Sequence, residues 1–139
     1  MESKTFLDFL PTNFRHEKSF FIQNNLTDFD QLSNLSDLDI NEIPRKSPWC
    51  TLNTLNKIRA IAIFKKEIGI SPPKGYLLLH CGISTIKSLS QSTPYELERK
   101  IGRLERTLRV KNETNTTFSL LKEWIKKASQ IEKSIGNLG

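Results

Sequence analysis

The sequence predicts an all-α protein, in which two helix-hairpin-helix-like repeats pack on a central helix and a C-terminal helix closes the fold. Three observations lead to this prediction. Residues 76–89 read as a helix, a tight turn at Gly82 and a second helix, because glycine readily takes the left-handed conformation that ends a helix. A similar pattern occurs 57 residues earlier. Between the two, residues 51–68 contain the longest uninterrupted helical pattern of the chain.

Length and composition indicate one compact domain, or two very small domains that share a core. The chain has 139 residues, of which 37% are hydrophobic, and this is enough to bury a core. We expect the first repeat at residues 1–46, the central helix at 47–70, the second repeat at 71–110 and the C-terminal helix at 111–139. No apolar run reaches the ~18–20 residues that span a bilayer, so we expect a cytoplasmic protein without a membrane span. The oligomeric state is left open.

Positive charge is distributed unevenly along the chain. The formal net charge is +6, yet residues 1–42 carry three basic and eight acidic side chains, whereas residues 43–139 carry eighteen basic and seven acidic ones. A basic field favours an anionic partner such as nucleic acid, an acidic protein surface or an anionic membrane face. An equally weighted alternative is that the acidic part folds back onto the basic part.

The first repeat begins with a helix over residues 14–22, whose apolar side chains share one side. Asn25 follows, and asparagine is the non-glycine residue that best tolerates a positive φ. We therefore expect a hairpin at Asn25 as well. Thr27 and Ser36 are the expected N-caps of two further helices, and the second of these helices should stop or kink at Pro44.

Residues 22–40 align with residues 79–97 without a gap. The alignment pairs Ile22 with Leu79, Asn25 with Gly82, Leu26 with Ile83, Phe29 with Ile86, Leu32 with Leu89, Ser36 with Thr93 and Ile40 with Leu97. So many apolar and capping matches at one offset indicate an internal repeat. The alternative is that any two amphipathic helix-turn-helix segments align this well.

The central helix and the second repeat follow from local signals. Residues 51–68 are apolar over most of the helix circumference, which predicts burial on several sides, and Gly69 ends the pattern. Ser71 followed by two prolines is a strong helix start. Ser84 offers a cap to the helix after Gly82, and residues 93–96 form a capping box that begins a helix continuing over residues 97–110.

The helix over residues 97–110 carries the candidate binding surface. One side is apolar, and much of the remainder is basic, with Arg99, Lys100, Arg103, Arg106 and Arg109. The C-terminal helix, expected over residues 118–134, adds Lys126 and Lys127, along with Lys122 and Lys133. We expect this surface to contact an anionic partner. The alternative is a solvated helix side that Glu98 and Glu105 partly neutralise.

Nothing in the sequence has the composition of an active site. There is no glycine-rich phosphate loop, no pair of carboxylates on an apolar helix face and no nucleophile beside a base. His80 and Cys81 are adjacent, but neighbouring residues on a helix point about 100° apart and cannot address one substrate atom. Cys50 and Cys81 lack metal-ligand spacing and are expected to be small buried side chains. We therefore predict no enzyme, no catalytic residue, no cofactor and no metal site.

The hairpins resemble those of helix-hairpin-helix modules. Such modules present hairpin amides to a phosphate without sequence preference, and their loops usually read glycine, apolar, glycine. Gly82 and Ile83 fit that pattern, whereas Ser84 stands at the second glycine position and the first repeat has neither glycine. The candidate hairpin residues are thus Asn25, Gly82 and Ser84. Their side chains restrict close approach of a phosphate to the backbone.

A further set of short segments runs along nearly the whole chain: residues 10–11 and 14–17, 52–59, 77–83, 93–97 with 103–104, and 124–125 with Ala128. In these segments and in their order, the chain resembles a small cyanobacterial family of unknown function with paired helix-hairpin-helix-like repeats. The resemblance implies a fold and a lineage. It implies no activity and no functional residue.

These patterns together predict a non-enzymatic binding module that contacts a nucleic-acid backbone, DNA or RNA, through the basic surface around Arg99, Lys100, Arg103 and Arg106. The alternative is a protein-protein interaction adaptor that binds an acidic partner with the same repeats.

Overall fold

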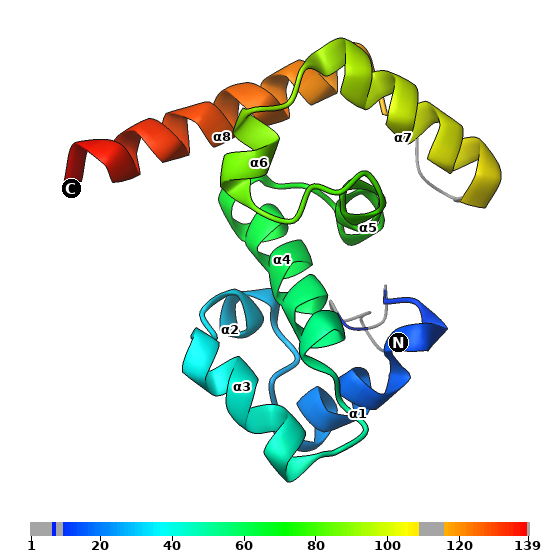
Figure 1. Cartoon of the computed structure of the whole chain (residues 1–139), viewed down its shortest axis with the longest axis vertical. Coiled ribbons are helices and arrows are strands. Elements are labelled where there is room, and N and C mark those ends of the chain that lie inside the picture. Colours follow the sequence, from blue (N-terminus) through cyan, green and yellow to red (C-terminus); the bar gives the residue numbers. More distant parts are fainter. Residues whose placement is uncertain (1–6, 8–9, 109–115, 139) are drawn as a thin grey trace, which may run out of the picture. The chain divides into compact units, whose positions relative to one another are not determined.

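The computed structural model describes residues 7, 10–108 and 116–138 (Figure 1). Within these ranges the chain is helical and contains no strand, so the predicted all-α class is confirmed. The chain forms two compact units, unit 1 (Met1–Pro72) and unit 2 (Pro73–Gly139). The four sequence ranges expected for the repeats, the central helix and the C-terminal helix stay a prediction.

Unit 1 comprises, in its described part, a short 3₁₀-helix and four α-helices. They are η2 (Thr12–Phe14), α1 (Arg15–Gln23), α2 (Phe29–Ser33), α3 (Asp37–Lys46) and α4 (Leu52–Ile68). Helix α4 packs against α2 and α3. Its apolar positions lie on several sides, which suits a helix with more than one neighbour. Fully buried side chains of this unit include Phe14, Phe21, Leu32, Ile40, Leu55, Ile58 and Phe64.

Both ends of α4 follow the local sequence. Thr51 caps the first turn, because its side chain accepts a hydrogen bond from the Thr54 amide. At the other end Gly69 has φ +88°, the left-handed conformation in which glycine ends helices. Lys65 and Lys66 lie in the last turn, where positive charge complements the helix dipole. The predicted bounds of this helix are therefore confirmed.

Two details of the preceding helices differ from the prediction. Helix α2 is capped by Asp28 rather than Thr27, since the Asp28 side chain accepts from the Asp30 amide while Gln31 reaches back to the Asp28 amide. Ser36 caps α3 as expected. However, α3 continues past Pro44 to Lys46. Proline removes only one amide there, and a proline this close to the C-terminal end leaves few helical bonds to lose.

Unit 2 also contains four described α-helices. They are α5 (Pro72–His80), α6 (Ile86–Ser90), α7 (Pro94–Leu108) and α8 (Phe118–Leu138). Helix α5 begins at the last residue assigned to unit 1. Helix α8 packs against α6 and α7, and it extends beyond its predicted end at Ser134. The predicted end of α7 at Val110 lies outside the described residues. Buried side chains of this unit include Leu77, Leu78, Ile83, Leu89, Leu97, Ile101, Leu121, Trp124 and Ala128.

The two hairpins have the same backbone conformation at their turns. Asn25 has φ +59° and Gly82 has φ +84°, so both residues take the predicted left-handed conformation. The amide of the next residue then donates back into the preceding helix, from Leu26 to the Phe21 carbonyl and from Ile83 to the Leu78 carbonyl. This bond is the 6→1 bond of a Schellman ending. The expected cap at Ser84 is wrong by one residue, because the Thr85 side chain caps α6.

The first three helices of each unit begin at matching positions. Helices α5, α6 and α7 start 57 residues after α1, α2 and α3, respectively. A fourth helix follows in both units, α4 in one and α8 in the other. Because both α7 and the segment that follows it are longer than α3 and its following segment, the last helix of unit 2 starts later than the 57-residue spacing would place it.

Each unit buries one charged side chain from its first helix. In α1, Glu17 is 3% exposed and accepts a hydrogen bond from the Thr51 amide, 2.9 Å away at the start of α4. In α5, Lys74 is 5% exposed; it lies 3.4 Å from the Glu105 carboxylate and donates to the Thr116 hydroxyl at 2.7 Å. Both side chains thus hold the segment that leads into the fourth helix of their unit.

Candidate functional site

The positive charge of the chain belongs to unit 2. Unit 1 contains nine basic and nine acidic residues and is formally neutral, whereas unit 2 contains twelve basic and six acidic residues. The folded chain therefore carries its whole net charge of +6 in one of its two units. The positive field of the chain is therefore centred on that unit.

Three arginines of α7 form a row on its exposed side. Arg99, Arg103 and Arg106 are exposed and recur at i, i+4 and i+7, the spacing of neighbours on one face of a helix. Leu97 and Ile101 are buried on the opposite side. We call these three residues the arginine row. The sequence correctly predicted their exposure.

Of the two acidic residues expected to neutralise this face, Glu98 is exposed and Glu105 is turned inward. Glu105 has a side chain only 12% exposed, 3.4 Å from the buried Lys74 ammonium. Its other carboxylate oxygen accepts from the Thr116 amide at 3.3 Å. The expectation that Glu105 partly neutralises the basic face is therefore wrong. The negative charge of Glu105 is paired with Lys74, 31 residues earlier in the chain. Helical periodicity alone does not predict this pairing.

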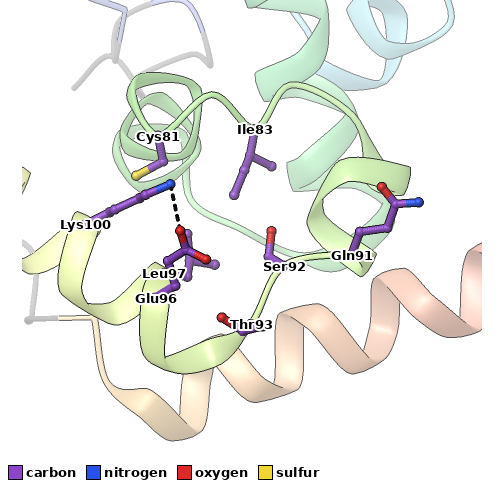
Figure 2. Close-up of a pocket in the computed structure, with 8 residues that line it drawn as sticks. All are labelled: Cys81, Ile83, Gln91, Ser92, Thr93, Glu96, Leu97 and Lys100. Atoms are coloured by element: carbon purple, nitrogen blue, oxygen red, sulfur yellow. Dashed lines mark ion pairs between the residues drawn. The ribbon is translucent and has the colours of Figure 1, made fainter.

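Lys100 lies apart from the arginine row. Figure 2 shows its ammonium beside Cys81 and paired with Glu96, one turn earlier in α7, at 3.4 Å. These side chains line a half-open pocket of about 110 Å³. Small-molecule sites usually measure ~300–1,000 Å³, so the pocket is too small for such a ligand. Lys100 is thus engaged on the side of α7 that lies near Cys81, the residue after α5.

The two cysteines have the character of structural side chains. Burial raises the pKa of the Cys81 thiol, and the positive charge of Lys100 opposes this only in part. Burial likewise raises the pKa of the Cys50 thiol, which donates to the His16 carbonyl and the Ser47 hydroxyl. A thiol with a raised pKa is a poor nucleophile at neutral pH. Cys50 is buried as expected, whereas Cys81 is only partly buried.

The two lysines predicted on α8 point in different directions. Lys126 is exposed, whereas Lys127 is paired with Glu123 one turn earlier at 3.1 Å. Adjacent helical residues point about 100° apart, so the two ammonium groups cannot share one face. Lys122 and Lys133, at i−4 and i+7 from Lys126, lie on its face and are exposed. We call Lys122, Lys126 and Lys133 the lysine row.

The hairpins offer few free amides for a phosphate. The amides of Cys81, Gly82 and Ile83 all donate to carbonyls of α5, and so do the corresponding amides of Asn24, Asn25 and Leu26 to α1. Asn25, Gly82 and Ser84 are themselves exposed. A phosphate at the hairpin apex would compete with these internal bonds. Arg109, the remaining predicted site residue, lies outside the described residues.

One aromatic pair beside the basic rows was not singled out from the sequence. Tyr95, in the first turn of α7, is 77% exposed. Its ring centroid lies 4.7 Å from that of Phe118, the first residue of α8. The Lys122 ammonium lies 5.7 Å from the centroid of the Phe118 ring, within the range of a cation–π contact. The spacing of Phe118 and Lys122 at i and i+4 is the only signal in the sequence for this arrangement.

Comparisons with known proteins place the chain in a family. The sequence pattern of the family described as Domain of unknown function (DUF4332) matches residues 11–131. Neither a curated protein nor a solved structure matches the chain. Among the described residues, no helix is long and apolar enough to cross a membrane. The prediction of a family of unknown function is confirmed: the chain belongs to the DUF4332 family.

Proposed function

We propose that this protein is a non-enzymatic binding module that contacts a nucleic-acid backbone through the arginine row of α7 and the lysine row of α8. The observation that supports it best is the inward turn of Glu105. Arg99, Arg103 and Arg106 are exposed on one helix face, while the nearby Glu105 carboxylate is directed toward Lys74. Guanidinium groups bind phosphate oxygens in a bidentate manner, which ammonium groups cannot do.

The dimensions of the arginine row suit a polyanion. Seven residues along an α-helix extend ~10 Å, and phosphates along one strand of B-form DNA advance ~3.4 Å each along the axis. The row therefore matches a run of about three phosphates. Contacts of this kind carry no sequence information, so we expect binding with little sequence preference.

A double charge reversal tests the proposal. We expect Arg99→Glu/Arg103→Glu to weaken binding of a fluorescent oligonucleotide by at least tenfold in fluorescence anisotropy. The slope of log K against log salt should also become shallower by about 1.4–1.8, since each phosphate contact contributes ~0.7–0.9. The matched control is Arg45→Glu/Lys46→Glu, which changes the net charge equally at two exposed residues of unit 1.

Two results of this experiment would contradict the proposal. Equal loss in both double variants would mean that only net charge matters and would contradict a site on α7. Absence of binding by the wild-type protein at low salt would reject the nucleic-acid proposal.

A protein-interaction adaptor with an acidic partner is the second candidate. Exposed apolar side chains in unit 1 favour a protein partner: Ile22 is 50%, Trp49 75% and Leu52 44% exposed. The Trp49 ring stacks on His16 with centroids 5.8 Å apart. A pull-down from cells, repeated after nuclease treatment, separates the candidates, because only a direct protein partner survives the nuclease.

We propose further that the two units are copies of one helix-hairpin-helix-like repeat, and that the protein is cytoplasmic and of cyanobacterial lineage. The common 57-residue spacing of three helices and the matching hairpin bonds support the repeat. Cell fractionation tests the location. A solution structure of the full chain tests the repeat, since the backbones of the two units should then superimpose from the first helix to the third.

A further inference from the structure

Tyr95 is exposed in a way that packing does not require. Its side chain is 77% exposed although its ring contacts Phe118 at a centroid distance of 4.7 Å and an interplanar angle of 41°. A large aromatic ring that serves only the core is normally buried, because burial of its area stabilises the fold. The contact with Phe118 fixes one side of the Tyr95 ring and leaves most of the residue open.

Each ring of the pair is followed by a cation one turn along its helix. Arg99 follows Tyr95 in α7, and the two residues line one shallow hollow together with Thr93 and Glu96. Lys122 follows Phe118 in α8, with its ammonium 5.7 Å from the ring centroid. The carboxylate of Glu96 is paired with Lys100 at 3.4 Å. The aromatic pair is thus flanked by the first cation of the arginine row and the first cation of the lysine row.

Unit 1 supplies an internal comparison. The residue 57 positions before Tyr95 is Leu38, which is also 77% exposed. The first residue of α4, which corresponds to Phe118 at the start of α8, is Leu52. The fold of each unit therefore leaves this position in its third helix exposed. Aromatic character at both positions is found only in the unit that carries the net positive charge.

We propose that Tyr95 and Phe118 form a stacking platform for an unpaired base of a single-stranded nucleic acid, with Arg99 and Lys122 holding the neighbouring phosphates. This inference rests on the proposed function and adds the class of ligand. A base in a duplex is covered on both faces by its neighbours and presents only its edges in the grooves. Only an unpaired base offers a face to Tyr95.

The platform predicts a tolerant specificity. Every base has a π-face, so stacking on an aromatic side chain depends little on sequence. The shared chemistry of DNA and RNA strands is an unpaired base with a phosphate on either side, and the platform addresses that chemistry. A thymidine 12-mer and a uridine 12-mer should therefore both bind more tightly than a 12-base-pair duplex.

Fluorescence anisotropy with these three labelled probes tests the proposal on the full chain. We expect Tyr95→Ala to weaken single-strand binding about tenfold, within the range for loss of one base-aromatic stack, and to leave duplex binding unchanged within twofold. Tyr95→Phe keeps the ring and should bind like wild type. Leu38→Ala is the matched control, because it removes an equally exposed large apolar side chain from the corresponding position of unit 1. Circular dichroism verifies the fold of each variant.

Each outcome decides between the proposals. Equal affinity for the single strands and the duplex, with Tyr95→Ala unchanged, would overturn the platform and leave phosphate binding by the two rows intact. An equal loss from Leu38→Ala would overturn the placement of the platform in unit 2. Failure of all three probes at low salt would overturn the platform and the proposed function together, as would tighter binding of an acidic peptide than of any oligonucleotide.

Discussion

The buried ion pair of Lys74 and Glu105 makes a sharp prediction about stability. Replacing Lys74 with methionine keeps a chain of similar length and removes the ammonium that lies 3.4 Å from the Glu105 carboxylate and 2.7 Å from the Thr116 hydroxyl. The exposed fractions of the two paired side chains are 6% and 12%. Loss of one partner from a buried pair costs about 3–5 kcal/mol, because the remaining charge is left desolvated. We expect about 3 kcal/mol, since Glu105 is slightly exposed and keeps its bond from the Thr116 amide.

Urea denaturation followed by tryptophan fluorescence measures this loss in the unit that contains the pair. Trp124 in α8 is 4% exposed, whereas Trp49 in unit 1 is 75% exposed, so the change in signal on unfolding arises mainly from unit 2. The matched control is Lys127→Met, which breaks a shorter but solvent-exposed pair with Glu123 at 3.1 Å. Exposed pairs contribute about 0–1 kcal/mol, so this variant should unfold close to wild type.

A double variant completes the test. Replacing both partners, as in Lys74→Met/Glu105→Leu, removes the two charges together and should recover most of the lost stability, since a well-packed apolar pair is often as stable as a buried ion pair. If Lys74→Met unfolds within about 0.5 kcal/mol of wild type, or if the double variant is no more stable than Lys74→Met, the reasoning from burial is refuted.

Two further predictions concern the helix ends. Gly82→Ala should lower the free energy of unfolding by about 1–2 kcal/mol. The residue has φ +84°, and a Cβ there would meet no atom within 4 Å, so the loss comes from backbone strain alone. Gly82→Asn should lower it less, since Asn25 adopts φ +59°, and equal losses in the same urea titration would contradict this. The pKa of Asp39 should lie below its usual value, because its carboxylate accepts a hydrogen bond from the Ser36 amide and, with a smaller effect on the pKa, one from the Ser36 hydroxyl. Because the pKa is lowered on folding, the capping box adds stability that is complete above the unfolded pKa of about 3.9 and is lost as pH falls through the folded pKa. An NMR titration of the Asp39 carboxyl with a midpoint at or above the usual value would contradict the capping geometry.

Several features of the fold follow from short stretches of sequence. The turns at Asn25 and Gly82 and the end of α4 at Gly69 were predicted to the residue, and the start of α4 to within one residue, at Cys50 or Thr51. A left-handed residue or a capping hydroxyl acts on its own few neighbours. The caps of α2 and α6 were each placed one residue too early. In both segments two residues with capping side chains are adjacent, and the second of them is the cap, four residues before a fully buried leucine, Leu32 or Leu89.

In the candidate site, too, some features follow from local sequence and others only from the packing of the helices. The sequence by itself determined that Arg99, Arg103 and Arg106 share one face, since the helical repeat fixes the direction of side chains three and four residues apart. Only the tertiary structure decided what lies around them. Glu105 turns toward Lys74, and Tyr95 meets Phe118; both pairs join residues on different helices. Such pairings depend on how helices pack, which local spacing does not encode, and they determine which charges and rings of unit 2 remain open to a partner.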